Sequence, residues 1–448
     1  MPLVLPLLVA LAAPPAAAEP TLDIPHERYQ LDNGLDVILH RDPALPQVVV
    51  NLWYGVGSKD EAAGRSGFAH LFEHLMFMGT ERLPGSGFDD EMESHGGWNN
   101  AWTSEDATDY YDVGPANLLP LLLWMEADRM DGLDAAMTQE KLDLQRDVVR
   151  NERRQSSEDQ PYGVLWLEMN KALYPPDHPY GHSVIGSHED LQAGTLGDLV
   201  GFFQSWYGPD NAGLVVAGDF EVAETKALIE RLFGHLEPVQ PPERPAPAPV
   251  DIPEKPLVEL TDQVQLPMTT MLWHTAPALS QDDAVMDVVA SILGDGRSSR
   301  FYRALVEEQS LALEADAYQM SQLLSGVFMV QGKPTDGHTI EELEAAMQAE
   351  IERLAAEGPT PEELERVSNT IELMFLSGLE DLHSRAAALN RYRYIQGDPG
   401  WVAQDLARYR AVTADDVKAA AARLSVARRG IMRVRPEPTP EAAPLGGE

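Results

Sequence analysis

Two histidines and a glutamate at helical spacing, His70, Glu73 and His74, are the residues of this sequence best suited to metal chemistry. They lie in a stretch from Gly67 to Gly79 that holds good helix formers and no proline, which predicts a short helix with Gly79 just past its end. Positions i, i+3 and i+4 of a helix share one face, so both imidazoles and the carboxylate should point into one small volume. The other positions are almost all apolar, which indicates a buried helix.

A metal ion would compensate the cost of burying these three ionisable side chains. Two imidazole nitrogens and a nearby carboxylate are the minimum for a Zn²⁺ hydrolase, because they supply two ligands and a base for water. The alternative is that the histidines are ordinary hydrogen-bonded core residues, and the apolar setting favours the metal. The chain contains no cysteine, so any metal must be held by histidine and carboxylate.

Glu152, which lies 78 positions after His74, is a candidate third ligand. The sequence predicts a helix from Thr138, its N-cap, to about Gln155. Val148 and Val149 lie one turn before Glu152 and make that part of the helix apolar, so the carboxylate could project inward. The pattern alone leaves open that Glu152 is one of the many exposed glutamates of this chain.

The composition is strongly acidic, with 72 acidic and 33 basic residues and a formal net charge of −39 over 448 residues. Such a charge disfavours nucleic acid and anionic membranes as partners. The simplest interpretation is a solvated acidic surface, and the alternative is selection of basic peptides. The length predicts at least two domains.

The first 18 residues predict a signal peptide. Residues 1–13 form an apolar run too short to span a bilayer, and Ala16-x-Ala18 is typical of a signal-peptidase site. The run contains no Lys or Arg, and no cysteine follows it to carry a lipid anchor. We therefore expect an exported protein, periplasmic or extracellular, with no transmembrane segment.

A proline-rich connector at residues 238–256 divides the mature chain into two parts of about equal length. The boundaries predict an N-terminal domain at 21–237, a C-terminal domain at 257–435 and a disordered tail at 436–448. Strands are expected in a hairpin at 29–40 and at 48–54, 96–104, 108–112, 212–220, 257–260, 269–274, 327–331 and 430–434. Helices are expected at 118–130, 138–155, 163–172, 196–207, 222–236, 284–293, from about 301, and at 339–356, 360–395 and 403–424.

The order of elements is similar in both parts, which predicts duplicated α+β halves. The counterpart of the metal helix lies at 284–293 and carries no metal ligand. Its expected role is to shape a cavity over the site.

Several ordered motifs resemble those of the pitrilysin/insulinase family, the zinc peptidases with the inverted motif HxxEH, and most of all its short bacterial members, which also resemble mitochondrial processing peptidase. The resemblance covers essentially the whole mature chain. It rests on His70-Leu71-Phe72-Glu73-His74 with Phe77, Gly97 with Asn100-Ala101-Trp102-Thr103, Arg146 to Glu152, His178-Pro179-Tyr180-Gly181 and Gly296-Arg297-Ser298-Ser299-Arg300.

This resemblance implies a zinc-dependent metalloendopeptidase with one Zn²⁺ per chain. His70, His74 and Glu152 would be the zinc ligands and Glu73 the general base. Glu73 would take a proton from the attacking water and pass it to the departing amine.

The resemblance also implies an α+β fold of two homologous α/β halves, each a mostly antiparallel sheet packed with helices, that close as a clamshell. A peptide or unfolded polypeptide would bind as an added edge strand near Asn100, Ala101 and Trp102, and its side chains would fit pockets.

The chain departs from the family pattern at three positions. A second glutamate seven residues before the ligand is replaced by Gln145, which could still hydrogen-bond a zinc-bound histidine. Members that work alone carry in their later half an Arg and, seven residues on, a Tyr that hold the substrate carbonyl and oxyanion. Val306 and Leu313 align with that pair, and neither can donate a hydrogen bond.

In two-subunit members a homologue without metal supplies the Arg and Tyr. We therefore expect the chain to be the zinc-bearing subunit of a heterodimer, with a homodimer as the alternative. Another alignment would let Tyr302 or Tyr318 serve instead. A non-catalytic assembly homologue should have lost Glu73 or a ligand, and a structural metal site should have four protein ligands, so the retained set favours the enzyme.

Overall fold

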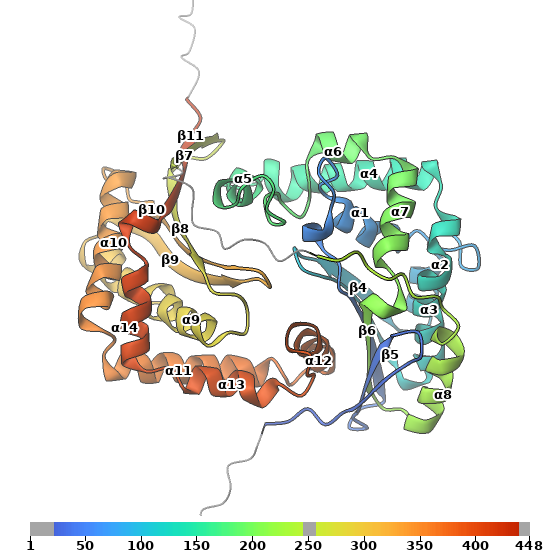
Figure 1. Cartoon of the computed structure of the whole chain (residues 1–448). Coiled ribbons are helices and arrows are strands. Elements are labelled where there is room, and N and C mark those ends of the chain that lie inside the picture. Colours follow the sequence, from blue (N-terminus) through green and yellow to red (C-terminus); the bar gives the residue numbers. More distant parts are fainter. Residues whose placement is uncertain (1–21, 245–256, 439–448) are drawn as a thin grey trace, which may run out of the picture.

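The computed structural model describes residues 22–244 and 257–438. The predicted signal peptide, most of the proline-rich connector and nearly all of the predicted disordered tail lie outside these ranges. The domain boundaries remain predictions, although the described chain does form two halves that face each other (Figure 1).

The first half is built on a six-stranded sheet with the order β1-β2-β6-β3-β5-β4. All neighbouring strands are antiparallel except β2 and β6. The strands are β1 Glu27–Gln30, β2 Asp36–Arg41, β3 Gln47–Tyr54, β4 Trp98–Thr103, β5 Thr108–Pro115 and β6 Ala212–Gly218. Strand β4 ends the sheet and is hydrogen-bonded only to β5 among the described strands, so its outer edge can accept another strand.

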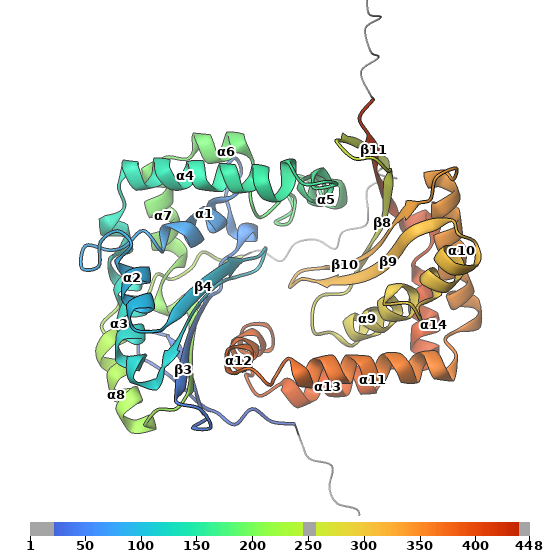
Figure 2. The same ribbon diagram turned by 180° about the vertical axis from the view of Figure 1, so that it is seen from behind.

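Helices cover one face of this sheet and enclose the largest apolar core, to which α1, α3, α7 and α8 contribute (Figure 2). The helices of the first half are α1 Phe68–Leu75, α2 Gly87–Ser94, α3 Leu119–Ala136, α4 Gln139–Arg153, α5 Val164–Leu173, α6 His188–Ala193, α7 Leu196–Trp206 and α8 Val222–Phe233. A residue such as Leu71 on α1 is completely buried in this core.

The second half repeats the sheet without the first strand. Its order is β7-β11-β8-β10-β9, and β7 and β11 are its one parallel pair among the described strands. The strands are β7 Leu257–Asp262, β8 Met268–Thr275, β9 Ala312–Ser321, β10 Gly326–Pro334 and β11 Gly430–Pro436. The helices are α9 Gln281–Gly294, α10 Ile340–Glu357, α11 Pro361–Ser377, α12 Leu382–Gln396, α13 Val402–Arg410 and α14 Ala414–Arg423.

This order confirms the duplicated α+β architecture. Strands β2, β6, β3, β5 and β4 occupy the places that β7, β11, β8, β10 and β9 occupy in the second sheet, including the parallel pair. Helix α1 follows the third strand of the first half as α9 follows β8 in the second.

The halves exchange a helix. Leu389 and Tyr392 of α12 pack on the face of the first sheet that is turned away from α1, with residues such as Val49 and Val215. Leu165 and its neighbours on α5 pack on the second sheet in the same way. Both helices lie between the halves in Figures 1 and 2. Each sheet is therefore covered on one face by its own helices and on the other by a helix of the opposite half.

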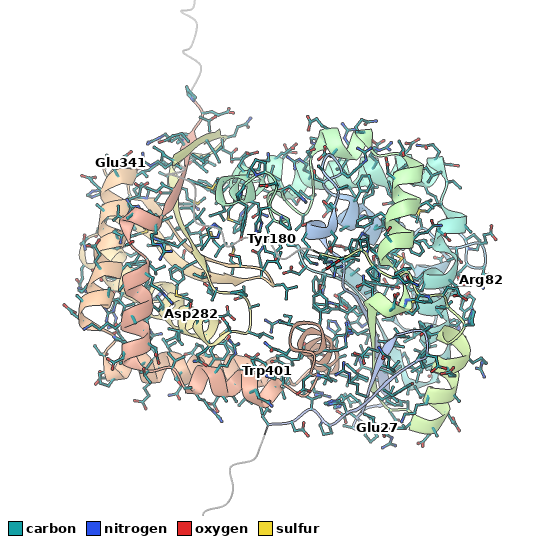
Figure 3. All side chains as sticks on the ribbon, viewed as in Figure 1. Glu27, Arg82, Tyr180, Asp282, Glu341 and Trp401 are labelled. Atoms are coloured by element: carbon teal, nitrogen blue, oxygen red, sulfur yellow. The ribbon has the colours of Figure 1, made fainter. Side chains whose placement is uncertain are left out.

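Hydrogen bonds also join the halves near Tyr180, which Figure 3 labels where they meet. Its hydroxyl donates to Asp106 at 2.5 Å and accepts from the backbone N–H of Leu324 at 3.0 Å. On the α12 side, the buried amide of Asn390 donates to the carbonyl of Gly213 at 3.0 Å.

Most predicted elements are present, with differences in extent. Helix α1 ends at Leu75 rather than just before Gly79. The predicted helix at 360–395 is two helices, α11 and α12, and that at 403–424 is also two. The segment after 301 forms a π-helix at Tyr302–Glu308. The short helices α2 and α6 and the strand β9 were not predicted. No helix of the described chain is long and apolar enough to cross a bilayer.

Candidate metal centre

Helix α1 is fixed at its N-terminus by a buried carboxylate. Glu61 accepts hydrogen bonds from the N–H groups of Gly67 at 2.8 Å and Ala69 at 2.7 Å. These are groups that the helix itself leaves without partners. Gly67 has a φ of +91°, and a Cβ there would lie 2.8 Å from the carbonyl oxygen of Ile185. Both features define where α1 begins, and its apolar side chains then set the direction of its polar face.

The polar face of α1 brings His70 and His74 together with Glu152 on α4. The ring centroids of the two histidines are 4.8 Å apart. Nε2 of His74 lies 3.1 Å from Glu152 Oε2, and Nε2 of His70 lies 3.6 Å from Glu152 Oε1. One ligand atom from each of the three residues lies within 4.8 Å of the others. Within the described ranges, this is the one group of three or more such side chains close enough to hold an ion.

These distances fit a zinc ion. Tetrahedral ligands at about 2.0–2.1 Å from zinc lie about 3.4 Å from one another, which is close to both observed N···O separations. The Nδ1 atom of His70 is buried without a hydrogen-bond partner in the described structure, so the ring is not held as an ordinary core histidine. The set of two nitrogens and one oxygen leaves room for a fourth ligand, as catalytic zinc sites have.

The surroundings favour the protonation states that bind a metal. Burial lowers the pKa of His70 to about 4, although the Glu152 carboxylate opposes this shift. A hydrogen bond with His74 lowers the pKa of Glu152. His70 is therefore neutral and Glu152 ionised at neutral pH, and these are the forms that donate electron pairs to a cation.

Glu73 lies on the same helix and contacts the edge strand of the sheet. Its Oε2 accepts a hydrogen bond from the Thr103 hydroxyl of β4 at 2.5 Å. Burial raises the pKa of Glu73, while the hydrogen bond from Thr103 lowers it. The carboxylate is thus oriented toward the strand edge, on the same helix as His70 and His74.

Helix α4 is held in place by arginines that precede and follow Glu152. Arg146 donates to the carbonyl oxygens of Leu191 at 2.8 Å and Gly194 at 2.7 Å. Arg153 donates to Glu158 at 2.8 Å. The bonds of Arg146 tie α4 to the segment around α6, and the bond of Arg153 joins the end of α4 to the turn that follows it.

The residues predicted to bind substrate lie on β4, as their predicted role requires. The side chains alternate between two faces: Ala101 packs against the main core, while Trp102 is 37% exposed on the opposite face. The N–H of Ala101 donates to the side-chain oxygen of Asn100 at 2.9 Å, in an exposed position. Their role in substrate binding stays a prediction.

Other predicted positions make no hydrogen bond or ion pair with His70, His74 or Glu152 in the described part of the chain. Gln145 donates its amide to Met78 Sδ at 2.7 Å. Val306 packs against the second core, and Leu313 is 53% exposed on β9. No hydrogen bond or ion pair within 22–244 and 257–438 joins Tyr302 or Tyr318 to the histidines or to Glu73.

Two contributors to the site were not found from the sequence. Glu61 lies six residues before the residue it caps, outside the spacing of a capping box. Thr103 belongs to the motif around Asn100, but nothing in the sequence says that its hydroxyl meets Glu73. The alternation of β4 was the available signal, because it puts Thr103 on the same face as Ala101.

Fold and site together define a class: two like α+β halves in which one helix carries both histidines and a carboxylate beside a sheet edge. Residues 36–181 match the family model described as insulinase (peptidase family M16), and residues 195–371 match that of the peptidase M16 inactive domain. The chain belongs to the pitrilysin/insulinase family of peptidases, which confirms the predicted resemblance.

Similar proteins are named as zinc proteases. The chain is 29% identical over 377 residues to the zinc protease PqqE of Helicobacter pylori, covering 83% of this chain and 84% of that protein. It is 24% identical over 373 residues to the uncharacterized zinc protease YmxG of Bacillus subtilis, covering 83% and 88%.

Solved structures have the same fold. A protease from Helicobacter pylori superposes with a TM-score of 0.83 at 26% identity, covering 92% of this chain and all of that one. The periplasmic protease PqqL from Escherichia coli superposes with a TM-score of 0.75 at 19% identity, covering 94% of this chain and 48% of that one. This chain thus corresponds in fold to about half of PqqL.

Proposed function

We propose that the protein is a zinc-dependent endopeptidase that hydrolyses peptides or unfolded polypeptides. The observation that carries the proposal is the position of Glu73, which lies beside the cluster of His70, His74 and Glu152 and is hydrogen-bonded to the edge strand β4. A base, a metal-binding set and a strand edge are thus within one site. The family membership and the zinc-protease names of the relatives support the same function.

Each residue has a defined task. His70, His74 and Glu152 would hold the zinc ion, which when bound supplies a Lewis acid that polarises the scissile carbonyl and acidifies water. Glu73 accepts the proton of the attacking water and later donates it to the amine that leaves. Thr103 orients the carboxylate of Glu73 through its hydroxyl.

The edge of β4 is suited to an extended substrate. The N–H of Ala101 donates to the side-chain oxygen of Asn100 in an exposed position. An incoming peptide carbonyl can replace that side-chain oxygen, and further backbone bonds along the edge would hold the peptide as an added strand. Only an unfolded segment can bind in this way, which is why folded proteins are poor substrates in this proposal.

The proposal includes a second subunit. Val306 and Leu313 cannot donate hydrogen bonds to the substrate carbonyl or the oxyanion, so a homologous chain without metal would supply an Arg and a Tyr in a heterodimer. A homodimer is the alternative. Full activity of the isolated monomer, unchanged by any homologous chain, would contradict this part. We also propose that the protein is exported, which is compatible with its likeness to a periplasmic protease.

A Glu73→Gln variant tests the function. The amide keeps the size of the side chain and its bond with Thr103 but cannot accept the proton, so cleavage of an unfolded polypeptide should fall about 10²- to 10⁴-fold. Zinc content, measured by atomic emission after dialysis, should stay at one per chain. A matched control is Glu91→Gln, an exposed carboxylate on α2. Unchanged cleavage by Glu73→Gln, or no cleavage by the zinc-loaded wild type with candidate partners, would favour a non-catalytic homologue.

A further inference from the structure

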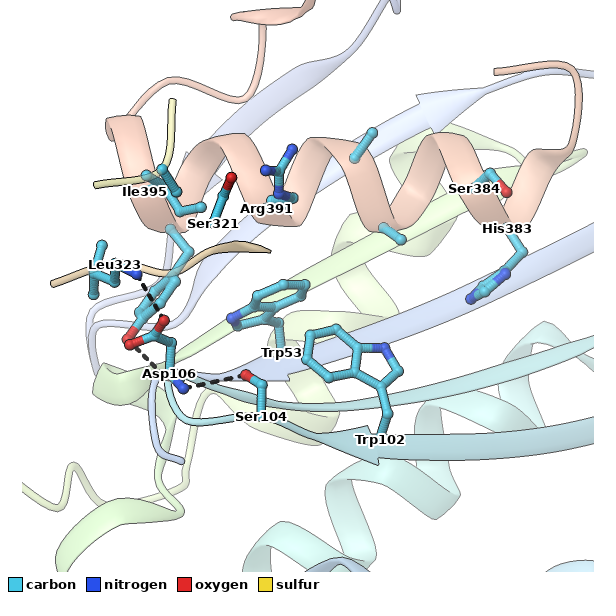
Figure 4. Close-up of a pocket in the computed structure, with 14 residues that line it drawn as sticks. Trp53, Trp102, Ser104, Asp106, Ser321, Leu323, His383, Ser384, Arg391 and Ile395 are labelled. Carbon is cyan, nitrogen blue, oxygen red and sulfur yellow. Dashed lines mark hydrogen bonds between the residues drawn. The ribbon is translucent and has the colours of Figure 1, made fainter. Parts of the chain in front are cut away.

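A cavity lies between the halves, on the face of β4 away from α1 (Figure 4). It has a volume of about 500 Å³. The sheet contributes Trp53 and Trp102, whose rings meet edge to face with centroids 5.0 Å apart. Helix α12 contributes the opposite wall, including His383 and Arg391. The cavity is therefore closed by the exchanged helix and belongs to neither half alone.

Three nitrogen groups of this cavity have no hydrogen-bond partner in the described structure. The indole N–H of Trp53, a residue only 5% exposed, makes no hydrogen bond in the described structure, and neither does the buried Nε2 of His383. Arg391 is half-buried, and its guanidinium has no hydrogen bond or ion pair within the described ranges. An unpaired, half-buried arginine is unexpected in a chain with 72 acidic residues and 33 basic ones.

Asp106, the one carboxylate that lines the cavity in the described chain, already has hydrogen-bond partners. Asp106 accepts hydrogen bonds from the Tyr180 hydroxyl at 2.5 Å and from the N–H of Leu323 at 2.8 Å. No ion pair joins Asp106 to Arg391 in the described chain. The indole N–H of Trp53 and the guanidinium of Arg391 are thus donors without an acceptor, and a carboxylate oxygen is a suitable acceptor for such groups.

The pleat of β4 connects this cavity with the substrate edge. Thr103 faces Glu73 on the metal side, whereas Trp102 and Trp98 face α12, where the Trp98 ring lies 6.3 Å from that of His383. A peptide added at the edge of β4 has the same alternation. Every second side chain of the peptide is directed toward the metal side, and those between are directed toward the cavity.

We propose that this cavity is a substrate subsite that binds a carboxylate of the peptide, either an acidic side chain or the C-terminal carboxylate, with Arg391 as its positive partner. The proposal rests on the proposed peptidase function. The tryptophan rings would contact the aliphatic part of the bound residue. The net charge of −39 repels highly acidic peptides. At physiological ionic strength this repulsion is screened beyond about 8 Å, so Arg391 can still attract a carboxylate that enters the cavity. A net-basic peptide with one carboxylate is therefore the best ligand.

Binding to the full-length, zinc-loaded Glu73→Gln protein tests the subsite without requiring cleavage. Calorimetry compares one net-basic peptide in four forms: without a carboxylate, with Glu at either of two adjacent positions, and with a free C-terminal carboxylate. We expect one carboxylate form to bind about tenfold more tightly than the form without. Because the pleat alternates, Glu at the adjacent position should gain little. Preference for the side chain or for the terminus identifies the source of the carboxylate.

Substitutions of Arg391 test whether this residue causes the tenfold preference for a carboxylate. Arg391→Gln should abolish the tenfold preference and Arg391→Lys should keep part of it, whereas Arg303→Gln, at an exposed arginine of the second half, should leave it unchanged. Equal affinities for all forms, no binding, or a preference that survives Arg391→Gln in a folded protein would each overturn the subsite. If the carboxylate preference is found but the wild type cleaves no peptide, the proposed function fails and the carboxylate-binding site stands. If the wild type cleaves peptides but binds all four forms equally, the subsite fails and the proposed function stands.

Discussion

The two halves share one sheet order but use two corresponding helices, α1 after β3 and α9 after β8, for different purposes. In the first half, α1 directs His70, Glu73 and His74 toward α4 and the edge of β4. In the second half, α9 is apolar over most of its length and carries three aspartates, Asp282, Asp283 and Asp287, all of which bond to other groups of the protein. The fold thus places a helix next to the sheet in both halves. The side chains of that helix decide whether it can bind a metal ion.

The aspartates of α9 show what the same position does without a metal. Asp283 accepts hydrogen bonds from Ser321 of β9 and from the N–H of Leu279 at 2.9 Å. Asp287 accepts one from the Tyr409 hydroxyl of α13 at 2.7 Å. These bonds tie α9 to its neighbours, so the polar groups of the second half are used to hold elements together.

The largest effect should come from removing one of the proposed metal ligands of the first half. Loss of a group that merely supports a metal ligand costs about 10- to 100-fold, so His74→Ala should lower zinc affinity and cleavage by more than about 100-fold. Asp287→Asn, on the corresponding helix of the second half, should leave the zinc content unchanged. Metal analysis and a peptide assay measure both, with His95→Ala, half-exposed on the surface, as the control. Equal zinc loss in His74→Ala and Asp287→Asn would contradict the claim that only the first half holds the metal.

The exchanged helices allow a test of whether the halves are independent. Leu389 on α12 and Leu165 on α5 are completely buried against the opposite sheets. Truncating either to alanine should lower the free energy of unfolding by about 2–5 kcal/mol in a single transition, measured in urea. The exposed residues Gln396 and Lys171 on the same helices provide matched alanine controls. Separate transitions, with each variant affecting only one, would show that the halves fold alone.

Asp287 should make the second half sensitive to pH. Burial raises the pKa of Asp287 to about 7, far above its value in an unfolded chain. A raised pKa means that the protonated form is favoured in the folded state, so this stabilisation is complete below about pH 4 and is lost as the pH rises through 7. Asp287→Asn should therefore reduce the loss of stability between pH 5 and pH 8 by about 2 kcal/mol. The same pH dependence in both proteins would contradict this assignment.

The smallest expected effect concerns the hydrogen bond from Thr103 to Glu73, the proposed general base. Thr103→Val removes the donor to Glu73 while keeping the shape of the side chain, so kcat should fall about 3- to 10-fold with little change in KM. Thr261→Val, at an exposed position on β7 of the second half, is the matched control. A change in KM alone would indicate that Thr103 acts on the substrate strand and not on Glu73.

Local patterns predicted much of this molecule. The helical spacing of His70 and His74 and the alternation of the strands require only neighbouring residues, so these features could be found from the sequence. The strand β9 was missed because charged residues such as Glu314 and Asp316 interrupt its pattern, and the very short helices α2 and α6 give a weak periodic signal.

Features that depend on distant segments were not predictable in the same way. The spacing of Glu152 in the sequence does not say that α4 lies against α1, and only the family resemblance favoured it as a ligand. The bonds of Glu61 to α1 and of Thr103 to Glu73 join separate elements. The exchange of α5 and α12 depends on which apolar faces meet across the molecule, and a helix with buried residues has the same pattern whichever sheet it covers.

The reciprocal exchange of α5 and α12 means that the covalent connection between the halves contributes little to their association. Each half isolated from the other would expose one apolar face of its sheet and a helix with nothing to cover. A chain nicked between residues 244 and 257 should therefore remain a single particle in solution, whereas either fragment expressed alone should aggregate.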